Sequence, residues 1–434
     1  MPYPYPRHLA TRVQQLARVY PVVLITGARQ VGKTTLLRQT FPEAPFQTLD
    51  LPSVAYEAEQ NGVEFLSGFG GRGQVVLDEV QYAPSLFRSM KYVVDADRHR
   101  MGRFLMTGSQ KFVLMQHVAE SLAGRIGIVE MDTLGSAELL DALPLNPPPL
   151  NEMLWRGGYP ELWRSPELQP RDFFASYLAT YLERDVRQII NVTSLRDFER
   201  FIRMCALRTG NLVNLDALAS DVGISGPTAR QWLTVLEASN IIHLLPPYFA
   251  NQNRRLIKTP KLYFRDTGLA CFLLGLGTVE QMLSSPLLGA VWETFVLGQI
   301  MRHREVSPQP AEVYFWRDAH GLEVDFAIWL NGRLQLVETK WSETATDSHA
   351  LKPMHKVRAH LGQLASDRHL YVCRTQFNHW HPHDPSVRVV NGFTFRDWFE
   401  LPEPPSSVLR EDEVPYKVAR KPVAAKRVTR RKRS

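Results

Sequence analysis

The feature that most constrains the fold of this chain is a short glycine-containing segment near its N-terminus. The apolar run Val22 to Thr26 leads directly into Gly27-x4-Gly32-Lys33-Thr34, and a helical stretch follows. A strand, a glycine loop and a helix in this order let successive backbone N–H groups converge on phosphate oxygens, and the helix N-terminus adds a favourable dipole. The pattern therefore predicts an α/β P-loop domain with ATP and Mg²⁺ as its cofactors.

Two residues of the loop have predicted roles of their own. Lys33 places a positive charge at the β- and γ-phosphates, and the hydroxyl of Thr34 binds Mg²⁺. The residues predicted to contact the nucleotide are Gly27, Ala28, Arg29, Gln30, Val31, Gly32, Lys33, Thr34 and Thr35.

Two acids follow a second apolar strand, Val75 to Leu77. An acid at the carboxyl end of a parallel strand faces the crevice in which ligands bind. We therefore expect Asp78 to hold Mg²⁺, directly or through water, and Glu79 to orient the attacking water as a general base.

Two further polar positions are candidates for sensing or stabilising the γ-phosphate. Ser109 follows a third strand, Phe104 to Thr107, and is the first choice of sensor, with Thr107 second; the alternative is an ordinary turn. Arg125 is a candidate cation for the transition state, in cis or from a neighbouring subunit, and the alternative is a surface arginine. The role in trans would make the protein a homo-oligomer.

These motifs together resemble a known family. Gly157 to Glu161 and Tyr181 to Asp185 are similar to its middle segment, and the resemblance spans roughly residues 5 to 400. The family is the bacterial and archaeal group of AAA-type ATPases whose C-terminal part is domain of unknown function 4143. Ala28 stands where the family usually has proline, and alanine accepts the same backbone. The resemblance implies an AAA-type fold and ATP hydrolysis, and it rests on Pro21 to Thr35, Val76 to Gln81, Met106 to Gln110 and Ser121 to Arg125.

A helix-turn-helix pattern lies near the middle of the chain. Residues 215–221 form a helix capped by Asn214, Gly223 gives a tight turn, and Ser225 caps a second helix that runs to about Ala238. Residues 241–245 and 261–264 are predicted wing strands of a winged-helix module. DNA contact is one interpretation, and packing or subunit contact is the other. The candidate nucleic-acid contacts are Thr228, Arg230 and Gln231 on the second helix and Arg254, Arg255 and Lys258 in the wing loop.

A charged hairpin is the most informative feature of the C-terminal part. Asn331-Gly332 between two apolar-rich runs predicts a two-residue turn in which Leu330 pairs with Arg333. Asp325 then faces Glu338, and Glu323 faces Lys340, all on one face of the hairpin. Facing carboxylates repel each other, and a divalent cation between them would reverse the sign of that interaction.

The same hairpin resembles the metal site of the restriction-endonuclease-like fold, whose pattern Asp325, Glu338 and Lys340 match. Lys340 could stabilise a pentavalent phosphorane or help to activate water, and Glu293 could add a further carboxylate. The alternatives are an inactive nuclease-like fold used for binding and a solvated ladder of charges. For the alternating His379, His381 and His383, we expect a loop rather than a metal site.

The net positive charge of the chain comes from its C-terminal end. Residues 417–434 contain nine Lys or Arg and no acid, and without them the net charge of +7 becomes −2. We expect this tail to be disordered and to bind DNA or RNA through counterion release; the alternative is a solubilising terminus.

Other features argue for a cytoplasmic protein without a membrane partner. The longest apolar runs fall short of the roughly 20 residues of a membrane helix, and the N-terminus lacks the pattern of a secretory signal. Three widely spaced cysteines, Cys205, Cys271 and Cys373, suit core thiols in a reducing compartment.

Five segments are expected. They are an ATPase domain (1–145), a helical connector (146–205), a winged helix-turn-helix (206–265), an endonuclease-like α/β domain (266–400) and a basic tail (401–434). The first functional hypothesis is an ATP-driven protein that acts on nucleic acid, with metal-dependent phosphodiester cleavage in the C-terminal domain. The second is an ATP-regulated interaction protein whose C-terminal domains are scaffolds.

Overall fold

A computed structural model describes residues 5–69, 73–109, 114–115, 118, 120–181, 195–248, 259–345 and 350–403. The predictions made for Gln110, residues 182–185, Arg254, Arg255, Lys258 and the basic tail from residue 404 lie outside these ranges. None of the helices in these ranges is both long enough and apolar enough to cross a membrane.

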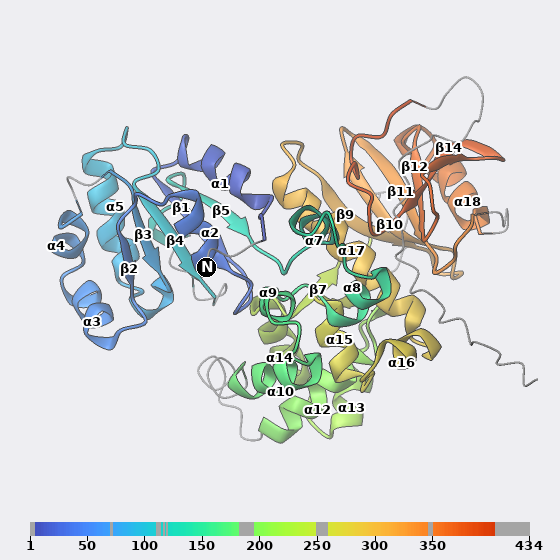
Figure 1. The fold of residues 1–434 in the computed structure, drawn as a ribbon, viewed down its shortest axis with the longest axis horizontal. Coiled ribbons are helices and arrows are strands. Elements are labelled where there is room, and N and C mark those ends of the chain that lie inside the picture. The colour runs from blue at the N-terminus through green and yellow to red at the C-terminus, as the bar shows by residue number, and fades with distance from the viewer. Residues whose placement is uncertain are drawn as a thin grey trace, which may run out of the picture.

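The N-terminal domain is built on a five-stranded parallel sheet (Figure 1). Its strand order is β2-β3-β4-β1-β5, so β4 lies between β1 and β3. Every residue of β1, β3 and β4 is buried, as expected for a parallel sheet covered on both faces. The three strands predicted here are confirmed, and the five are β1 (Val22–Thr26), β2 (Phe46–Thr48), β3 (Val75–Asp78), β4 (Phe104–Gly108) and β5 (Ile126–Glu130).

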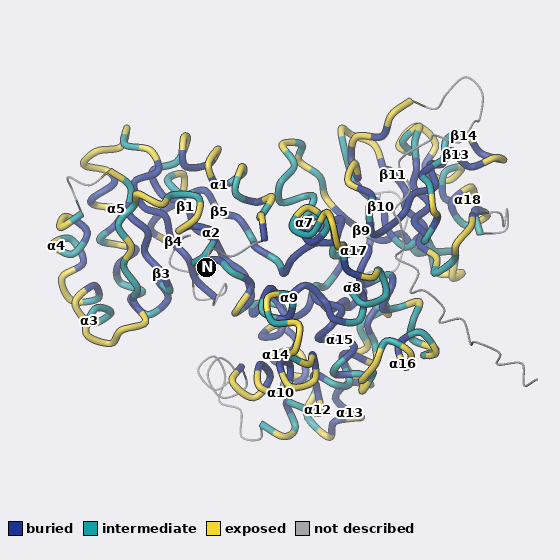
Figure 2. The backbone as a smooth tube through the Cα atoms, in the orientation of Figure 1, coloured by how far each residue is buried: buried dark blue, intermediate teal, exposed yellow. Residues whose placement is uncertain are grey.

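Alternate residues of β1 point into two different cores. Val23 and Ile25 pack in the same cluster as residues of α1 and α2, whereas Val22 and Leu24 pack in the same cluster as residues of α5. Figure 2 shows the strands buried and the exposed residues gathered on outer elements such as α3 and α4. The helices are α1 (Leu9–Ala17), α2 (Lys33–Thr40), α3 (Pro52–Gln60), α4 (Gly62–Ser67) and α5 (Leu86–Ala96), with a 3₁₀ turn η1 (Val80–Tyr82).

A helical middle part follows and contains a small antiparallel sheet of order β6-β8-β7. The predicted caps are confirmed, since Asn214 accepts a hydrogen bond from the Ala217 N–H and Ser225 accepts one from the Thr228 N–H. Gly223 makes the predicted turn with φ 82°. The elements are α7 (Ser136–Ala142), α8 (Leu150–Arg156), α9 (Pro160–Arg164), α10 (Pro170–Tyr181), α12 (Leu195–Ala206), β6 (Asn211–Leu212), α13 (Leu215–Val222), α14 (Gly226–Ala238), β7 (Ile242–Leu245), β8 (Lys261–Phe264), α15 (Thr267–Leu273) and α16 (Val279–Ser284).

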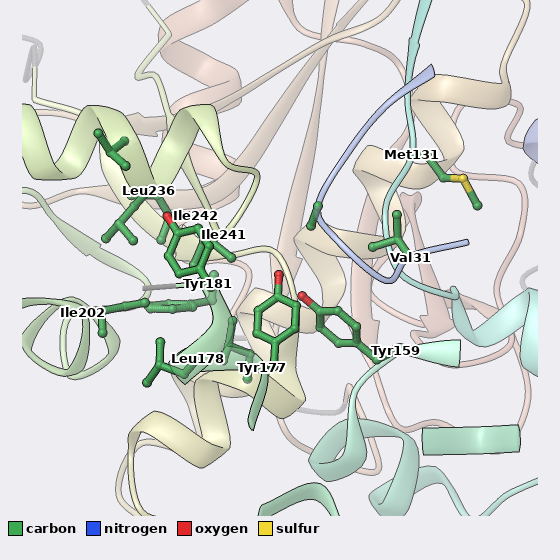
Figure 3. Packing of buried hydrophobic residues seen from close by; sticks show 14 of the residues in the cluster. Val31, Met131, Tyr159, Tyr177, Leu178, Tyr181, Ile202, Leu236, Ile241 and Ile242 are labelled. Atoms are coloured by element: carbon green, nitrogen blue, oxygen red, sulfur yellow. The ribbon is translucent and has the colours of Figure 1, made fainter. Parts of the chain in front are cut away.

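One hydrophobic cluster joins the N-terminal domain to this middle part. It runs from the glycine loop and the end of β5 through the aromatic side chains of α10 to α14 and β7. Figure 3 shows Tyr159 and Tyr177 between Val31 and Met131 on one side and Leu236, Ile241 and Ile242 on the other.

The packing of α12 on α14 contributes to the free energy of unfolding, and one substitution tests this contribution. Phe198 is fully buried, and its ring centroid lies 5.1 Å from that of Trp232. Replacing Phe198 by alanine should destabilise the middle part by about 3–5 kcal/mol, through lost burial and the cavity left behind. Thermal unfolding followed by tryptophan fluorescence measures this. The exposed Arg230 on α14 offers a matched control, and its alanine variant should change stability by less than about 0.5 kcal/mol. Equal effects of the two variants would contradict this account of the core.

The C-terminal domain is a six-stranded mixed sheet of order β13-β14-β12-β11-β10-β9 between α17 and α18. The predicted hairpin register is confirmed from Leu330↔Arg333 to Phe326↔Val337. Asn331 and Gly332 both have positive φ, as a type I′ turn requires. The elements are α17 (Leu288–Val306), β9 (Glu312–Arg317), β10 (Glu323–Leu330), β11 (Arg333–Thr339), α18 (Lys352–Leu361), a 3₁₀ turn η3 (Gly362–Leu364), β12 (His369–Cys373), β13 (His379–His381) and β14 (Asp384–Asn391).

The structure also tests the predictions made for the three cysteines and for the alternating histidines. Cys205, Cys271 and Cys373 are buried free thiols, as expected of core cysteines. The loop predicted around His379 and His381 is wrong, because both belong to β13, which pairs with β14 at the edge of the sheet. Pro382 is compatible with this strand because it lies in the turn that follows it.

Candidate functional site

The glycine loop connects β1 to α2 and has the backbone of a phosphate cradle. Gly27 has φ 152°, and a Cβ atom there would lie 2.2 Å from the carbonyl oxygen of Met131, so only glycine fits. Gly32, with φ 98°, directly precedes α2. Lys33 is the first residue of the helix, is buried, and donates hydrogen bonds to the carbonyl oxygens of Gly27 (3.0 Å) and Ala28 (2.8 Å). The ammonium group therefore lies over the loop.

Asp78 ends β3 and meets the loop at the carboxyl edge of the sheet. One of its oxygens, Oδ1, accepts hydrogen bonds from the hydroxyl of Thr34 (2.7 Å) and from that of Thr107 (2.5 Å). Burial raises the pKa of the Asp78 carboxyl, and the two hydroxyl hydrogen bonds oppose that shift. The structure thus brings together three residues predicted from separate motifs.

Glu79 follows in a left-handed conformation, with φ 57°. Its N–H donates to the Thr107 hydroxyl (3.2 Å), and its Oε2 accepts a hydrogen bond from the Ser109 hydroxyl (3.2 Å). The amide of Gln81 also donates to this carboxylate and lies 3.4 Å from the Ser109 oxygen. Ser109 is therefore beside the predicted base. The sequence motifs assign no role to Gln81, and its one signal is that it is a polar residue two positions after Glu79.

Arg125 is not brought to this site. It immediately precedes β5, and its carbonyl accepts a hydrogen bond from the N–H of Val22, at the amino end of β1. Because β1 and β5 are parallel, Arg125 lies at the amino edge of the sheet, whereas the glycine loop follows the carboxyl end of β1. The guanidinium binds both oxygens of Asp95, at 2.6 and 2.9 Å. This geometry does not favour Arg125 as a cation for the nucleotide site of its own chain. Its role in the site of a neighbouring subunit stays a prediction.

An arginine near the N-terminus contacts the loop, and the sequence contained no signal for it. The guanidinium of Arg7 donates to the carbonyl oxygens of Val31 (2.7 Å) and Asp132 (2.6 Å) and to the carboxylate of Glu138 (3.1 Å). It therefore ties the glycine loop to the segment between β5 and α7. Glu138 is 131 residues away in the chain, so only the fold reveals this contact.

The predicted C-terminal cluster is assembled around Asp325 of β10. Its Oδ2 accepts hydrogen bonds from the N–H (2.8 Å) and hydroxyl (3.1 Å) of Thr339 and lies 3.8 Å from the Lys340 ammonium. Lys340 also binds Glu338 at 2.6 Å. The other oxygen of Glu338, Oε2, is buried and has no hydrogen-bond partner among the residues that the structure describes. Asp325, Glu338 and Lys340 are thus adjacent, as predicted.

Glu293 of α17 belongs to the same cluster. It binds the ammonium of Lys261 (3.0 Å) and accepts a hydrogen bond from the Tyr263 hydroxyl. Glu323 forms ion pairs with Lys261 and with Arg317 (2.8 Å). The sequence pattern marks Lys261 and Tyr263 only as residues of a wing strand and assigns them no role in this cluster.

The cluster is crowded with negative charge. Burial, followed by the charge of Asp325, raises the pKa of Glu293 to about 7 and that of Glu338 to about 8, while Lys261 and Lys340 respectively oppose these shifts. Within the described residues, no group of three or more His, Cys, Asp or Glu side chains is arranged to hold a metal ion. A cation at Asp325 and Glu338 would therefore need water or substrate oxygens to complete its coordination.

Strand β8 joins this cluster to the N-terminal domain. Lys261 lies at one end of the strand. Arg265, directly after the other end, forms ion pairs with Glu130 and, at 2.8 Å, with Asp132. Glu130 is the last residue of β5, and Asp132 lies two residues beyond it. The small sheet of the middle part therefore contacts the C-terminal cluster through Lys261 and the carboxyl end of β5 through Arg265.

Three known protein families match successive parts of the chain. Residues 19–140 match a family described as an AAA domain, residues 148–280 match domain of unknown function 8612, and residues 288–388 match domain of unknown function 4143. Uncharacterized protein Rv2008c of Mycobacterium tuberculosis and uncharacterized protein Mb2031c of Mycobacterium bovis are each 33% identical to the chain over 349 residues, which is 80% of this chain and 76% of theirs. The chain belongs to the family of AAA-type ATPases with a C-terminal domain of unknown function 4143.

Solved structures are more distant from this AAA-type family member. A Walker-type ATPase of Pyrococcus abyssi has 17% identity and a TM-score of 0.42, over 61% of this chain and 94% of the other. The RuvB Holliday junction branch migration motor of Thermotoga maritima has 16% identity and a TM-score of 0.30, over 55% of this chain and 87% of the other.

Proposed function

We propose that this AAA-type protein hydrolyses ATP at the glycine loop. The observation that carries the proposal is that the Thr34 hydroxyl, Asp78 and the Lys33 helix meet at one edge of the sheet. Lys33 would bind the β- and γ-phosphates, and Glu79 would accept a proton from the attacking water. Thr34 and Asp78 would hold Mg²⁺, which would neutralise charge on the phosphates. Ser109 would position Glu79 through the hydrogen bond between them.

We further propose that the middle part binds nucleic acid as a winged helix. Three helices and a three-stranded antiparallel sheet support this assignment, with α14 as the recognition helix. Arg230 and Gln231 are exposed on α14 and would contact phosphates or bases, whereas the hydroxyl of Thr228 is bonded to Ser225 at 2.7 Å. The division into five segments, with the boundaries expected from the sequence, is part of this proposal.

The C-terminal domain is proposed to cleave phosphodiester bonds. Asp325 and Glu338 supply oxygen ligands suited to Mg²⁺, which is often held by one or two carboxylates and substrate phosphates. The buried Oε2 of Glu338, which has no hydrogen-bond partner in the described part of the chain, is the atom that supports this fit. Lys340 would stabilise the extra charge of the pentavalent phosphate, and a bound cation would supply an activated water.

Substitution of Glu338 by glutamine tests this activity. Cleavage of DNA or RNA in Mg²⁺ or Mn²⁺, with and without ATP, should fall at least roughly 100-fold, because a cation ligand is lost. ATP turnover should not change. Glu312→Gln, on an exposed position of β9 in the same sheet, is the matched control and should cleave normally.

A parent protein that cleaves neither DNA nor RNA with any divalent metal would favour the second candidate function. In that case the chain is an ATP-regulated interaction protein whose C-terminal domain is an inactive nuclease-like scaffold. The backbone and side-chain bonds of Thr339 to Asp325 favour this alternative, because they already satisfy one carboxylate oxygen.

A further inference from the structure

We propose that Lys261 and a divalent cation compete for the C-terminal carboxylate cluster, so that the small sheet of the middle part controls metal access. This inference rests on the proposed metal site at Asp325 and Glu338. The regulating group, Lys261, belongs to strand β8, a different part of the fold from the metal site.

The ammonium of Lys261 enters the carboxylate cluster beside the proposed cation position, on the side of Glu293 and Glu323. It lies 3.0 Å from Oε1 of Glu293 and forms an ion pair with Glu323, with its side chain only 3% exposed. Tyr263, two residues along the same strand, donates a hydrogen bond to the same oxygen of Glu293. Residues two apart share a face of a strand, so β8 presents a lysine and a tyrosine to the cluster together.

The balance of charge shows what Lys261 contributes. The cluster contains four carboxylates, those of Glu293, Glu323, Asp325 and Glu338. Three cations pair with them, namely Lys261, Lys340 and Arg317. Above the raised pKa values of Glu293 and Glu338, where all four carboxylates are ionised, the cluster has one excess negative charge when Lys261 is present and two when it is absent. Two excess charges are what one divalent cation neutralises.

Burial makes this difference large. A buried carboxylate that loses its cation is strongly destabilised, so the cluster without Lys261 needs a replacement cation. Within the described ranges, Oε2 of Glu338 has no hydrogen-bond partner, so it is an acceptor that Lys261 does not satisfy. A divalent ion at Asp325 and Glu338 would be repelled by the Lys261 ammonium as long as β8 keeps its place against α17 and β10.

Titration of Mn²⁺ into the full-length, nucleotide-free protein, followed by calorimetry, tests the competition. Lys261→Met keeps an unbranched apolar chain but removes the charge, and it should bind Mn²⁺ at least 10-fold more tightly than the parent protein. Lys261→Arg keeps the charge and is the matched control, with an affinity close to that of the parent. Adding Glu338→Gln to Lys261→Met should abolish the gain, which assigns the binding to this cluster and not to the glycine loop.

A second variant and a second readout keep the test decisive if the methionine variant does not fold. Lys261→Gln retains a donor for Glu293 without a charge and should show the same gain. Mn²⁺ should also raise the melting temperature of the neutral variants more than that of the parent. Equal Mn²⁺ affinity in the parent and the neutral variants would overturn the competition and leave the metal site standing. Absence of any binding sensitive to Glu338→Gln would overturn both.

Discussion

Replacing Lys33 by alanine should raise the dissociation constant for Mg·ATP by roughly 30-fold to several thousand-fold. Loss of one partner from a buried, hydrogen-bonded charge pair costs about 2–5 kcal/mol, which corresponds to this range. Lys33 is 5% exposed, and its ammonium lies within 3.0 Å of two loop carbonyl oxygens, so the loop holds this positive charge beside the expected phosphates. Equilibrium dialysis with radiolabelled ATP measures the change.

The control for this variant is Lys91→Ala, which removes an exposed lysine from α5 of the same domain. It should bind ATP as the parent does, while both variants keep the melting temperature of the nucleotide-free protein within a few degrees. Unchanged ATP affinity in Lys33→Ala would mean that the glycine loop does not bind the nucleotide.

The second large effect is expected for Glu79→Gln. A general base contributes about 10²- to 10⁴-fold to a rate, so ATP turnover should fall by that factor. Binding of ATP should change by less than about 3-fold, since Glu79 is assigned to the water and not to the phosphates. The Ser109 hydroxyl can still donate to the amide oxygen, which keeps the side chain in place. Steady-state phosphate release and ATP dialysis on the same preparation separate the two quantities.

Glu57→Gln, on an exposed position of α3, is the matched control and should hydrolyse ATP at the parent rate. A Glu79→Gln variant with normal turnover would transfer the role of base to another group. Weakened ATP binding together with weakened turnover would instead make Glu79 a residue of the binding site.

The parts of the fold that were predicted depend on local patterns. The apolar strands before Gly27 and Asp78, the caps Asn214 and Ser225, and the Asn331-Gly332 turn each contain their signal within a few residues. A parallel sheet then brings strand ends to one edge, which is why Thr34 and Asp78 meet although they are 44 residues apart. Motif spacing and strand direction are sufficient for such contacts.

Contacts between segments without a shared pattern were not predictable. Arg7 reaches the glycine loop only because α1 packs beside β1, and an arginine near the N-terminus has no distinguishing neighbour in the sequence. Lys261 and Tyr263 belong to one small sheet but bind a helix and a strand of the next domain. Gln81 had a local signal, yet its role depends on the direction in which Glu79 turns.

The position of Arg125 illustrates a different limit. The motif resembles the family at this position, but the motif alone does not say at which edge of the sheet the side chain lies. The parallel pairing of β5 with β1 places Arg125 at the amino edge, where it pairs with Asp95. A sequence pattern therefore identified the family there without identifying the geometry.

The most direct test of the account is a calorimetric titration of the full-length protein with ATP in the presence of Mg²⁺. We expect saturable heat with one nucleotide bound per chain, and loss of that heat when Lys33 is replaced by alanine. Absence of any heat from the parent protein, or the same binding curve for both proteins, would contradict it.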